Sequence, residues 1–233
     1  MSALKIFSGG AAHGLVKSVT GQFRELTGLD IEGEFGAVGV MAGKLRAGMQ
    51  ADIVVLTRAI IADLVRENLV TAASVTDIGR VETALAVRTG DPPVVARDGD
   101  MLRATFLAAD AIFTPDTKTS TAGIHVAGVL GKLGIAGEVA DRLNIFPNGA
   151  TAMRNLAASA AARPIGCTQS TEIISTEGVK LSGSLPQGYD LATVYTAAIT
   201  STAGKAEQAQ VLIDLLTGAG QHELRTRAGF VEI

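Results

Sequence analysis

A strand, a turn and a helix follow one another three times near the start of the chain, and this order restricts the fold more than any other feature. The strands are expected at 4–7, 30–35 and 52–56, and the helices at 11–26, 38–47 and 58–68. The third strand, DIVVL, is continuously apolar after its aspartate, which is typical of a strand buried on both faces of a sheet. Repeated strand–helix alternation predicts an α/β fold whose parallel strands are joined by right-handed crossovers.

The remaining chain continues the mixture of strands and helices. Further strands are expected at 81–88, 111–113, 144–146, 164–168 and 193–199, and further helices at 101–109, 124–133, 136–143, 150–162, 203–216 and 222–228. With 233 residues, 47% of them hydrophobic, the chain is long enough for one large domain or two small lobes with a real core.

Charge and cysteine content exclude several classes of function. The 20 basic and 23 acidic residues form no basic cluster, so we expect no nucleic-acid partner. The single cysteine, Cys167, excludes a disulfide framework and is expected to be a free buried thiol. The three histidines, at 13, 125 and 222, share no metal-ligand spacing, and neither a dinucleotide fingerprint nor a P-loop occurs. We therefore expect no metal and no cofactor.

The amino-terminal residues and the apolar segments bear on localisation. No charged leader with a long apolar region precedes the first strand, and no segment has the roughly 20 apolar residues of a membrane span. As it stands, the sequence predicts a cytoplasmic protein without a membrane span. If a leader has been trimmed, the prediction changes to a periplasmic protein, with an importer permease as its partner.

Four polar, glycine-rich turns each open a predicted helix. They are SGGA (8–11), GAVG (36–39), TSTAG (119–123) and NGAT (148–151). A helix N-terminus offers free N–H donors and a partial positive charge, and glycine lets a ligand approach the backbone. Several such turns could hold an anion without a lysine. For any single turn, ordinary helix capping explains the same residues.

The whole chain resembles the substrate-binding proteins of ABC importers that have the type 2 periplasmic fold, in particular their molybdate-binding branch. The matching stretches are IFSGGAA (6–12), QF (22–23), TGLDI (27–31), LRAG (45–48), ADIVVL (51–56) and AGF (228–230). The resemblance implies two Rossmann-like α/β lobes joined by crossover strands near 81–88 and 193–198. Lobe one would be 1–80 plus 195–233 and lobe two 81–194, with the ligand trapped in the cleft between them by hinge closure.

Three positions depart from the molybdate-binding pattern. The resemblance places ligand-binding serines at about Ala11 and at Val38 or Gly39, and a tyrosine near Gln169, and this chain has none of these side chains there. A buried ligand oxygen without its partner costs roughly 1–3 kcal/mol. We therefore expect a small organic anion, most simply a carboxylate that Arg58 could pair, in place of a tetrahedral oxyanion. The predicted ligand-binding residues line the turns and strand ends: Ser8, Gly9, Gly10, Ala11, His13, Val38, Gly39, Thr57, Arg58, Thr119, Ser120, Thr121, Gly149, Ala150, Thr151, Gln169 and Ser170.

An enzyme on the same fold is the alternative. Aconitate isomerase is also similar to this family, and its chemistry is a proton shift across an allylic tricarboxylate. His13 lies next to a predicted site turn, and a histidine side chain can act as a general base near neutral pH, so His13 is the candidate base if the protein is an isomerase.

Overall fold

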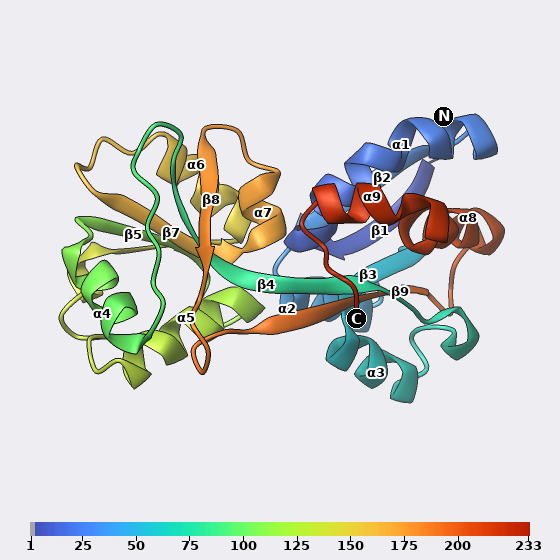
Figure 1. The fold of residues 1–233 in the computed structure, drawn as a ribbon. Helices are drawn as coiled ribbons and strands as arrows, with labels where there is room; N and C mark the ends of the chain where they lie inside the picture. Colours follow the sequence, from blue (N-terminus) through green and yellow to red (C-terminus); the bar gives the residue numbers. More distant parts are fainter. Residues whose placement is uncertain (1–2) are drawn as a thin grey trace. The chain divides into compact units, whose positions relative to one another are not determined.

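The computed structural model describes residues 3–233 and divides into two compact units, the first running to Val81 and resuming at Thr193, the second comprising Glu82–Ala192. Two strands, β4 (Thr76–Arg88) and β9 (Ala192–Ile199), carry the chain across these boundaries (Figure 1). The predicted α/β fold with crossover strands is confirmed.

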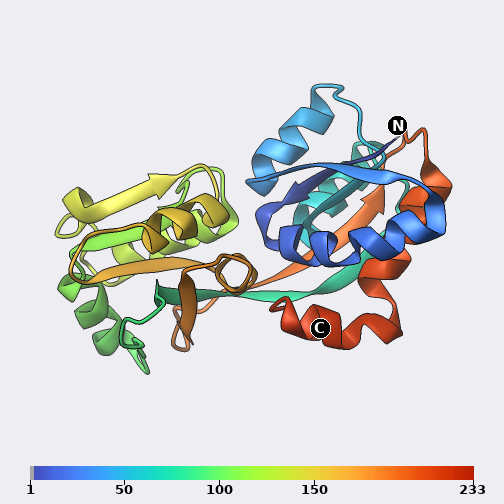
Figure 2. The same cartoon turned by 90° about the horizontal axis from the view of Figure 1, so that it is seen from above.

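Unit 1 is built on the strand–helix order at the start of the chain. Its other elements are β1 (Ala3–Gly9), α1 (His13–Thr27), β2 (Asp30–Gly36), α2 (Val38–Arg46), β3 (Ile53–Thr57), α3 (Arg58–Arg66), α8 (Ala206–Thr217) and α9 (His222–Arg227). Its strands follow the order β2-β1-β3-β9, in which β1 is parallel to β2 and β3 while β9 is antiparallel to β3. Figures 1 and 2 show α1, α8 and α9 on one face of this sheet and α2 and α3 on the other.

The core of unit 1 follows the predicted patterns. All five residues of β3 are buried, as its apolar run requires. In α1 the buried side chains include Leu15, Val19 and Phe23, whose four-residue spacing places them on one face. The helix ends where Gly28 adopts a left-handed conformation with φ of 71°, which glycine takes at little cost.

Unit 2 has a second sheet with helices on both faces. Its strands follow the order β4-β7-β5-β6, and β8 pairs with β4. Beyond β4, its elements are α4 (Gly99–Ala108), β5 (Ala111–Pro115), α5 (Thr121–Lys132), β6 (Leu143–Phe146), α6 (Gly149–Ala157), β7 (Pro164–Gln169), α7 (Ser170–Ile174) and β8 (Val179–Ser184). One apolar cluster joins α4 and α5 to the sheet and another joins α6 and α7 to it, so the two pairs cover opposite faces (Figure 1).

Several predicted boundaries in unit 2 are wrong. No α-helix forms over 136–143 among the residues that the structure describes, because this stretch consists of turns and the short 3-10 helix Ala140–Arg142. Gly134, with φ of 70°, ends the preceding helix, and Gly137, a residue of low helix propensity, lies in the stretch that remains before β6. Helix α5 begins at Thr121 and not at Ile124, and α6 ends at Ala157 rather than extending to residue 162.

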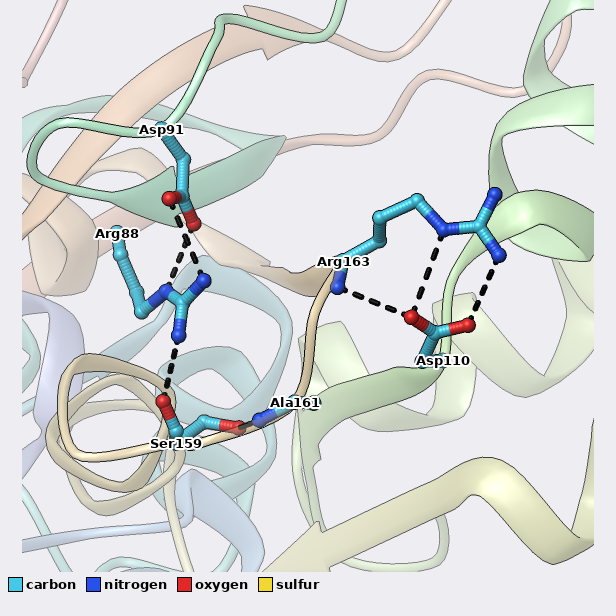
Figure 3. A network of polar contacts seen from close by, with 6 residues as sticks. All are labelled: Arg88, Asp91, Asp110, Ser159, Ala161 and Arg163. Carbon is cyan, nitrogen blue, oxygen red and sulfur yellow. Dashed lines mark hydrogen bonds and ion pairs between the residues drawn. The ribbon is translucent and has the colours of Figure 1, made fainter.

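Two ion pairs hold the edge of unit 2 at which β5 and β7 begin. Arg88 donates to Asp91 at 2.7 Å and to the carbonyl oxygen of Ser159 at 2.6 Å, while Arg163 pairs with Asp110 through its side chain and its backbone N–H (Figure 3). Together these bonds tie the end of β4 and the start of β5 to the segment that leads into β7.

Candidate functional site

The carboxyl ends of β1, β2 and β3 share one edge of the sheet in unit 1, which we call the carboxyl edge of unit 1. Gly9 pairs with Gly36 and Ser8 pairs with Val55, so these strands end beside one another. A helix follows each of them: α2 and α3 begin within two residues of the strand, and the 3-10 helix Gly10–Ala12 leads from β1 into α1. Open α/β sheets bind ligands at such edges, where backbone N–H groups and strand-end side chains are available.

The three α-helices that begin at this edge have no side-chain cap in the described part of the chain. Ala12, Ala37 and Thr57 occupy the positions before α1, α2 and α3, and within residues 3–233 none of their side chains makes a capping hydrogen bond. Ser8 is fully buried and donates its hydroxyl to the carbonyl oxygen of Gly9.

The charged and titratable residues near this edge have partners within unit 1. The guanidinium of Arg58 pairs with Asp77, its Nε lying 3.1 Å from Oδ1. Burial alone would favour the neutral form of Asp77, but hydrogen bonds from Arg58 and Thr196 hold its pKa below the ordinary value. His13 is exposed at the first turn of α1, and its ring lies 4.5 Å from that of Phe35.

Tyr195 is a residue of this edge that sequence reasoning missed. It is buried on β9 opposite Thr57, and a Cβ placed on Gly9 would lie 2.8 Å from its Cε1. Nothing in the local pattern of β9 marks this tyrosine, because its neighbours are set by strand pairing across the sheet.

The carboxyl edge of unit 2 is formed in the same way. β5 is parallel to β6 and β7, so Pro115, Phe146 and Gln169 end these strands on one side of the sheet. Helices α5, α6 and α7 start there.

The turn before α5 is held by hydrogen bonds to one carboxylate, and α5 itself has no side-chain cap in the described part of the chain. Asp116 accepts hydrogen bonds from the N–H groups of Lys118 and Thr119 and from the Thr119 hydroxyl, and these bonds hold its pKa below the ordinary value. Ser120 is buried in the position before α5, and no capping bond from its side chain is found in the described part of the chain. Thr121 is the first residue of the helix.

The first backbone N–H groups of α6 already have hydrogen-bond acceptors within the protein. The side chain of Asn148 accepts from the N–H of Thr151 at 2.8 Å, and the N–H groups of Gly149 and Ala150 donate to the buried carboxylate of Glu172. Sequence reasoning missed Glu172, which lies on the short helix α7 that was not predicted.

Each unit thus collects its share of the predicted ligand-binding residues at its own carboxyl edge. In unit 1 they are Ser8, Gly9, Gly10, Ala11, His13, Val38, Gly39, Thr57 and Arg58, and in unit 2 they are Thr119, Ser120, Thr121, Gly149, Ala150, Thr151, Gln169 and Ser170. Their role in binding stays a prediction.

Residues away from these edges are accounted for by structural contacts. Cys167 is buried and free as predicted, and burial raises the pKa of its thiol to about 12. His125 lies 2.7 Å from the carbonyl oxygen of Tyr189. Within residues 3–233 no group of three or more His, Cys, Asp or Glu side chains could hold a metal ion, and no helix is long and apolar enough to cross a membrane.

A cavity of about 450 Å³ lies at the opposite edge of unit 2, where β5 and β7 begin. Its lining includes Val87, Val94, Ala108 and Ile165, with Asp91 and Arg163 as its charged members. Both of these charged side chains are held in the ion pairs of Figure 3, so the cavity offers no open anion-binding group.

Comparison with known proteins places this geometry in a family. The chain is 22% identical over 225 residues to aconitate isomerase from Pseudomonas sp, covering 93% of this chain and 82% of the relative. The periplasmic molybdate-binding protein of Azotobacter vinelandii superposes with a TM-score of 0.82 at 19% identity, over 99% of both chains. The sulfate-binding protein of Mycobacterium tuberculosis superposes with a TM-score of 0.75 at 18% identity, over 100% of this chain and 88% of the other. A family model matches residues 4–231, and the chain therefore belongs to the bacterial extracellular solute-binding proteins.

Proposed function

We propose that this protein binds a small organic anion at the carboxyl edges of its sheets. The observation that carries the proposal is that, within residues 3–233, several helix N-termini without a side-chain cap gather at these edges. Asp98 caps α4 and Asn148 caps α6 through their side chains, whereas no side chain caps α1, α2, α3 or α5. These four uncapped helices open at the carboxyl ends of β1, β2, β3 and β5, and α7 opens uncapped after β7. α8 and α9, which follow no strand of these two edges, are also without a side-chain cap among the described residues.

Uncapped helix N-termini favour anions for a physical reason. Their first N–H groups have no partner in the helix, and the peptide dipoles add a partial positive charge of about half an elementary unit. Two structurally similar proteins are named for the oxyanions molybdate and sulfate, which supports an anion as the ligand here.

A carboxylate fits these edges better than a tetrahedral oxyanion. Ala11 and Val38, at the positions where the molybdate-binding pattern has hydroxyls, are buried and apolar. Removing hydroxyl donors from a buried oxyanion leaves its oxygens unpaired, at roughly 1–3 kcal/mol each. A carboxylate has only two oxygens to satisfy, and its apolar substituents can pack against such side chains.

Calorimetric titration with lactate, malate, phosphate and molybdate tests the proposal. We expect at least one carboxylate to bind in the micromolar range, and the Ser120→Ala variant to bind it about tenfold more weakly, because a hydrogen bond to a charged group contributes roughly 1.5–3 kcal/mol. The control is Ser201→Ala, an exposed serine that follows β9 at the edge of the unit 1 sheet where β3 begins, and this variant should bind like the wild type. Binding of the oxyanions alone, or equal effects of the two variants, would contradict the proposal.

An isomerase is the second candidate, favoured by the similarity to aconitate isomerase over 93% of the chain. In such a reaction a base removes a proton from one carbon of an allylic system and a proton is returned at the other end, so the composition of the acid is unchanged. His13, exposed at the start of α1, would be the base. Incubation with cis- and trans-aconitate in heavy water should then incorporate deuterium, and His13→Gln should abolish the exchange.

Three further points stay predictions: capture of the ligand between the two units, hinge closure and delivery to an importer permease. Solution scattering with and without the bound carboxylate tests closure, which predicts a smaller radius of gyration in the complex. An unchanged radius at saturating ligand would speak against a closing hinge.

A further inference from the structure

One carboxylate lies inside the carboxyl edge of unit 2 and has no role in the function proposed above. Glu172 is 5% exposed, on the short helix α7. Its Oε2 accepts a hydrogen bond of 2.6 Å from the hydroxyl of Thr168, and the N–H groups of Gly149, Ala150 and Gln169 also donate to the carboxylate. The donors come from the end of β7 and from the first turn of α6, so this carboxylate fills the anion position that α6 would otherwise offer.

The backbone at Gly149 packs tightly against the carboxylate of Glu172. A Cβ on Gly149 would lie 1.8 Å from Oε2 of Glu172 and 2.2 Å from Oγ1 of Thr168. These distances are far below van der Waals contact, so only glycine lets the N-terminus of α6 approach Glu172 this closely. The glycine of this turn is therefore explained by an internal carboxylate, without any external ligand.

The hydrogen bonds and the burial act on the charge of Glu172 in opposite directions. Burial is the largest effect and raises the pKa of the Glu172 carboxyl above its ordinary value, while the bonds from Thr168, Gly149, Gln169 and Ala150 oppose this rise by favouring the ionised form. The three backbone N–H groups can only donate, and a carboxylate is the form that accepts from all of them. The hydrogen-bond geometry around Glu172 therefore favours the ionised carboxylate over the neutral acid.

We propose that Glu172 determines the charge selectivity of this edge: as a built-in anion at α6 it limits the ligand to a single acidic group, which binds at the uncapped end of α5. This inference rests on the proposed function. A second carboxylate directed toward α6 would find its N–H donors taken and would face a like charge. A hydroxyl or another neutral donor in the same place could instead approach the carboxylate favourably.

A matched pair of ligands and a matched pair of variants test the inference. Lactate and malate share a 2-hydroxy acid core and differ in the second carboxylate. We expect the wild-type protein to bind lactate at least tenfold more tightly than malate. In the Glu172→Gln variant, which keeps the shape and removes the charge, this ratio should fall at least threefold. Glu177→Gln, an exposed glutamate in the same unit, is the control and should leave the ratio unchanged.

The outcomes separate this inference from the proposed function. If no carboxylate binds, the proposed function fails and the inference fails with it. If carboxylates bind but malate is as tight as lactate in the wild type, only the inference is overturned, and this result does not require the variant to fold. A folded Glu172→Gln variant, with wild-type circular dichroism, whose ratio equals that of the wild type would also overturn it.

Discussion

The backbone of Gly9 lies directly against the ring of Tyr195. A Cβ at residue 9 would lie 2.8 Å from Cε1 of Tyr195 and 2.7 Å from Cγ1 of Val38. Gly9 itself has φ of −61°, an ordinary value for any residue, so space and not backbone conformation requires glycine here.

Replacement of Gly9 by alanine should therefore destabilise unit 1 by overpacking. We expect the Gly9→Ala variant to lose about 1–3 kcal/mol of unfolding free energy, measured by urea denaturation. Gly21→Ala is the control, because a Cβ at this position in α1 meets nothing within 4 Å. That variant should gain about 0.5–1 kcal/mol, the ordinary preference for alanine in a helix. Equal stabilities of the two variants would show that Tyr195 does not lie where the structure places it.

The ion pair between Arg58 and Asp77 should affect acid stability more than ligand binding. The folded-state pKa of Asp77 is lowered, so its ionised form contributes stability that is present above the unfolded pKa and is lost as the pH falls through the folded value. The Arg58→Ala variant should therefore unfold at a higher pH than the wild type when acidified. Its carboxylate affinity should change less than twofold, because the guanidinium is already paired with Asp77.

The result decides between two assignments of Arg58. A tenfold loss of carboxylate affinity, without a shift in the pH at which half of the protein unfolds, would show that Arg58 binds the ligand, as the sequence predicted. The control is Arg66→Ala, which removes an ion pair with Asp63 on the exposed side of α3 and should change neither measurement.

Helix capping provides a third prediction, which compares two helix starts in unit 2. Asn148 caps α6 by accepting from the N–H of Thr151, so Asn148→Ala should lower the unfolding free energy by about 1 kcal/mol. Ser120 occupies the corresponding position before α5 but makes no capping bond within residues 3–233, so Ser120→Ala should cost less than about 0.5 kcal/mol. Thermal unfolding of both variants checks this difference, and an equal loss would contradict the assignment of α5 as the open helix.

The pattern of predicted and missed elements has a physical cause. β3 and α1 were predicted because continuous burial and a four-residue apolar spacing are local signals. α7 and β8 were missed because their stretch mixes serine, threonine and glutamate, and the helix spans only five residues. The helix predicted over 136–143 does not form. This stretch has apolar residues at helical spacing, but it lies two residues after Gly134 and contains Gly137.

The candidate site was predicted in part for the same reason. Glycine-rich turns after strands are visible in the sequence, and they do open helices at the carboxyl edges. Glu172 and Tyr195 were missed, because what places them there is contact between distant segments: Gly149 with Glu172, and Gly9 with Tyr195. No local pattern encodes such contacts, although both glycines were named for a different reason.

Cys167 provides a fourth prediction, concerning reactivity. Burial raises its thiol pKa to about 12, and the thiolate is the reactive form. At pH 8 the folded protein should react with iodoacetamide far more slowly than the urea-unfolded protein, whose thiol has an ordinary pKa. Mass spectrometry of the single adduct measures both rates. Comparable rates would mean that β7 opens readily or that Cys167 is not buried.

The two arginines at the beginning of the unit 2 sheet should differ in their contribution to stability. Arg88 is 22% exposed in its side chain and bonds both Asp91 and the carbonyl of Ser159, whereas Arg163 is 67% exposed and pairs with Asp110 (Figure 3). Water screens the second pair and competes for its hydrogen bonds, and loss of Arg88 leaves a half-buried carbonyl and carboxylate unpaired. We expect Arg88→Ala to lower the unfolding free energy by about 1–3 kcal/mol, and Arg163→Ala to have a clearly smaller effect, both measured by urea denaturation.

Binding of carboxylates should be unaffected by either change, because both arginines lie at the edge where β5 and β7 begin and the predicted site lies where these strands end. A reversed order of the two stabilities would show that the bond from Arg88 to Ser159 does not hold β4 to the segment before β7.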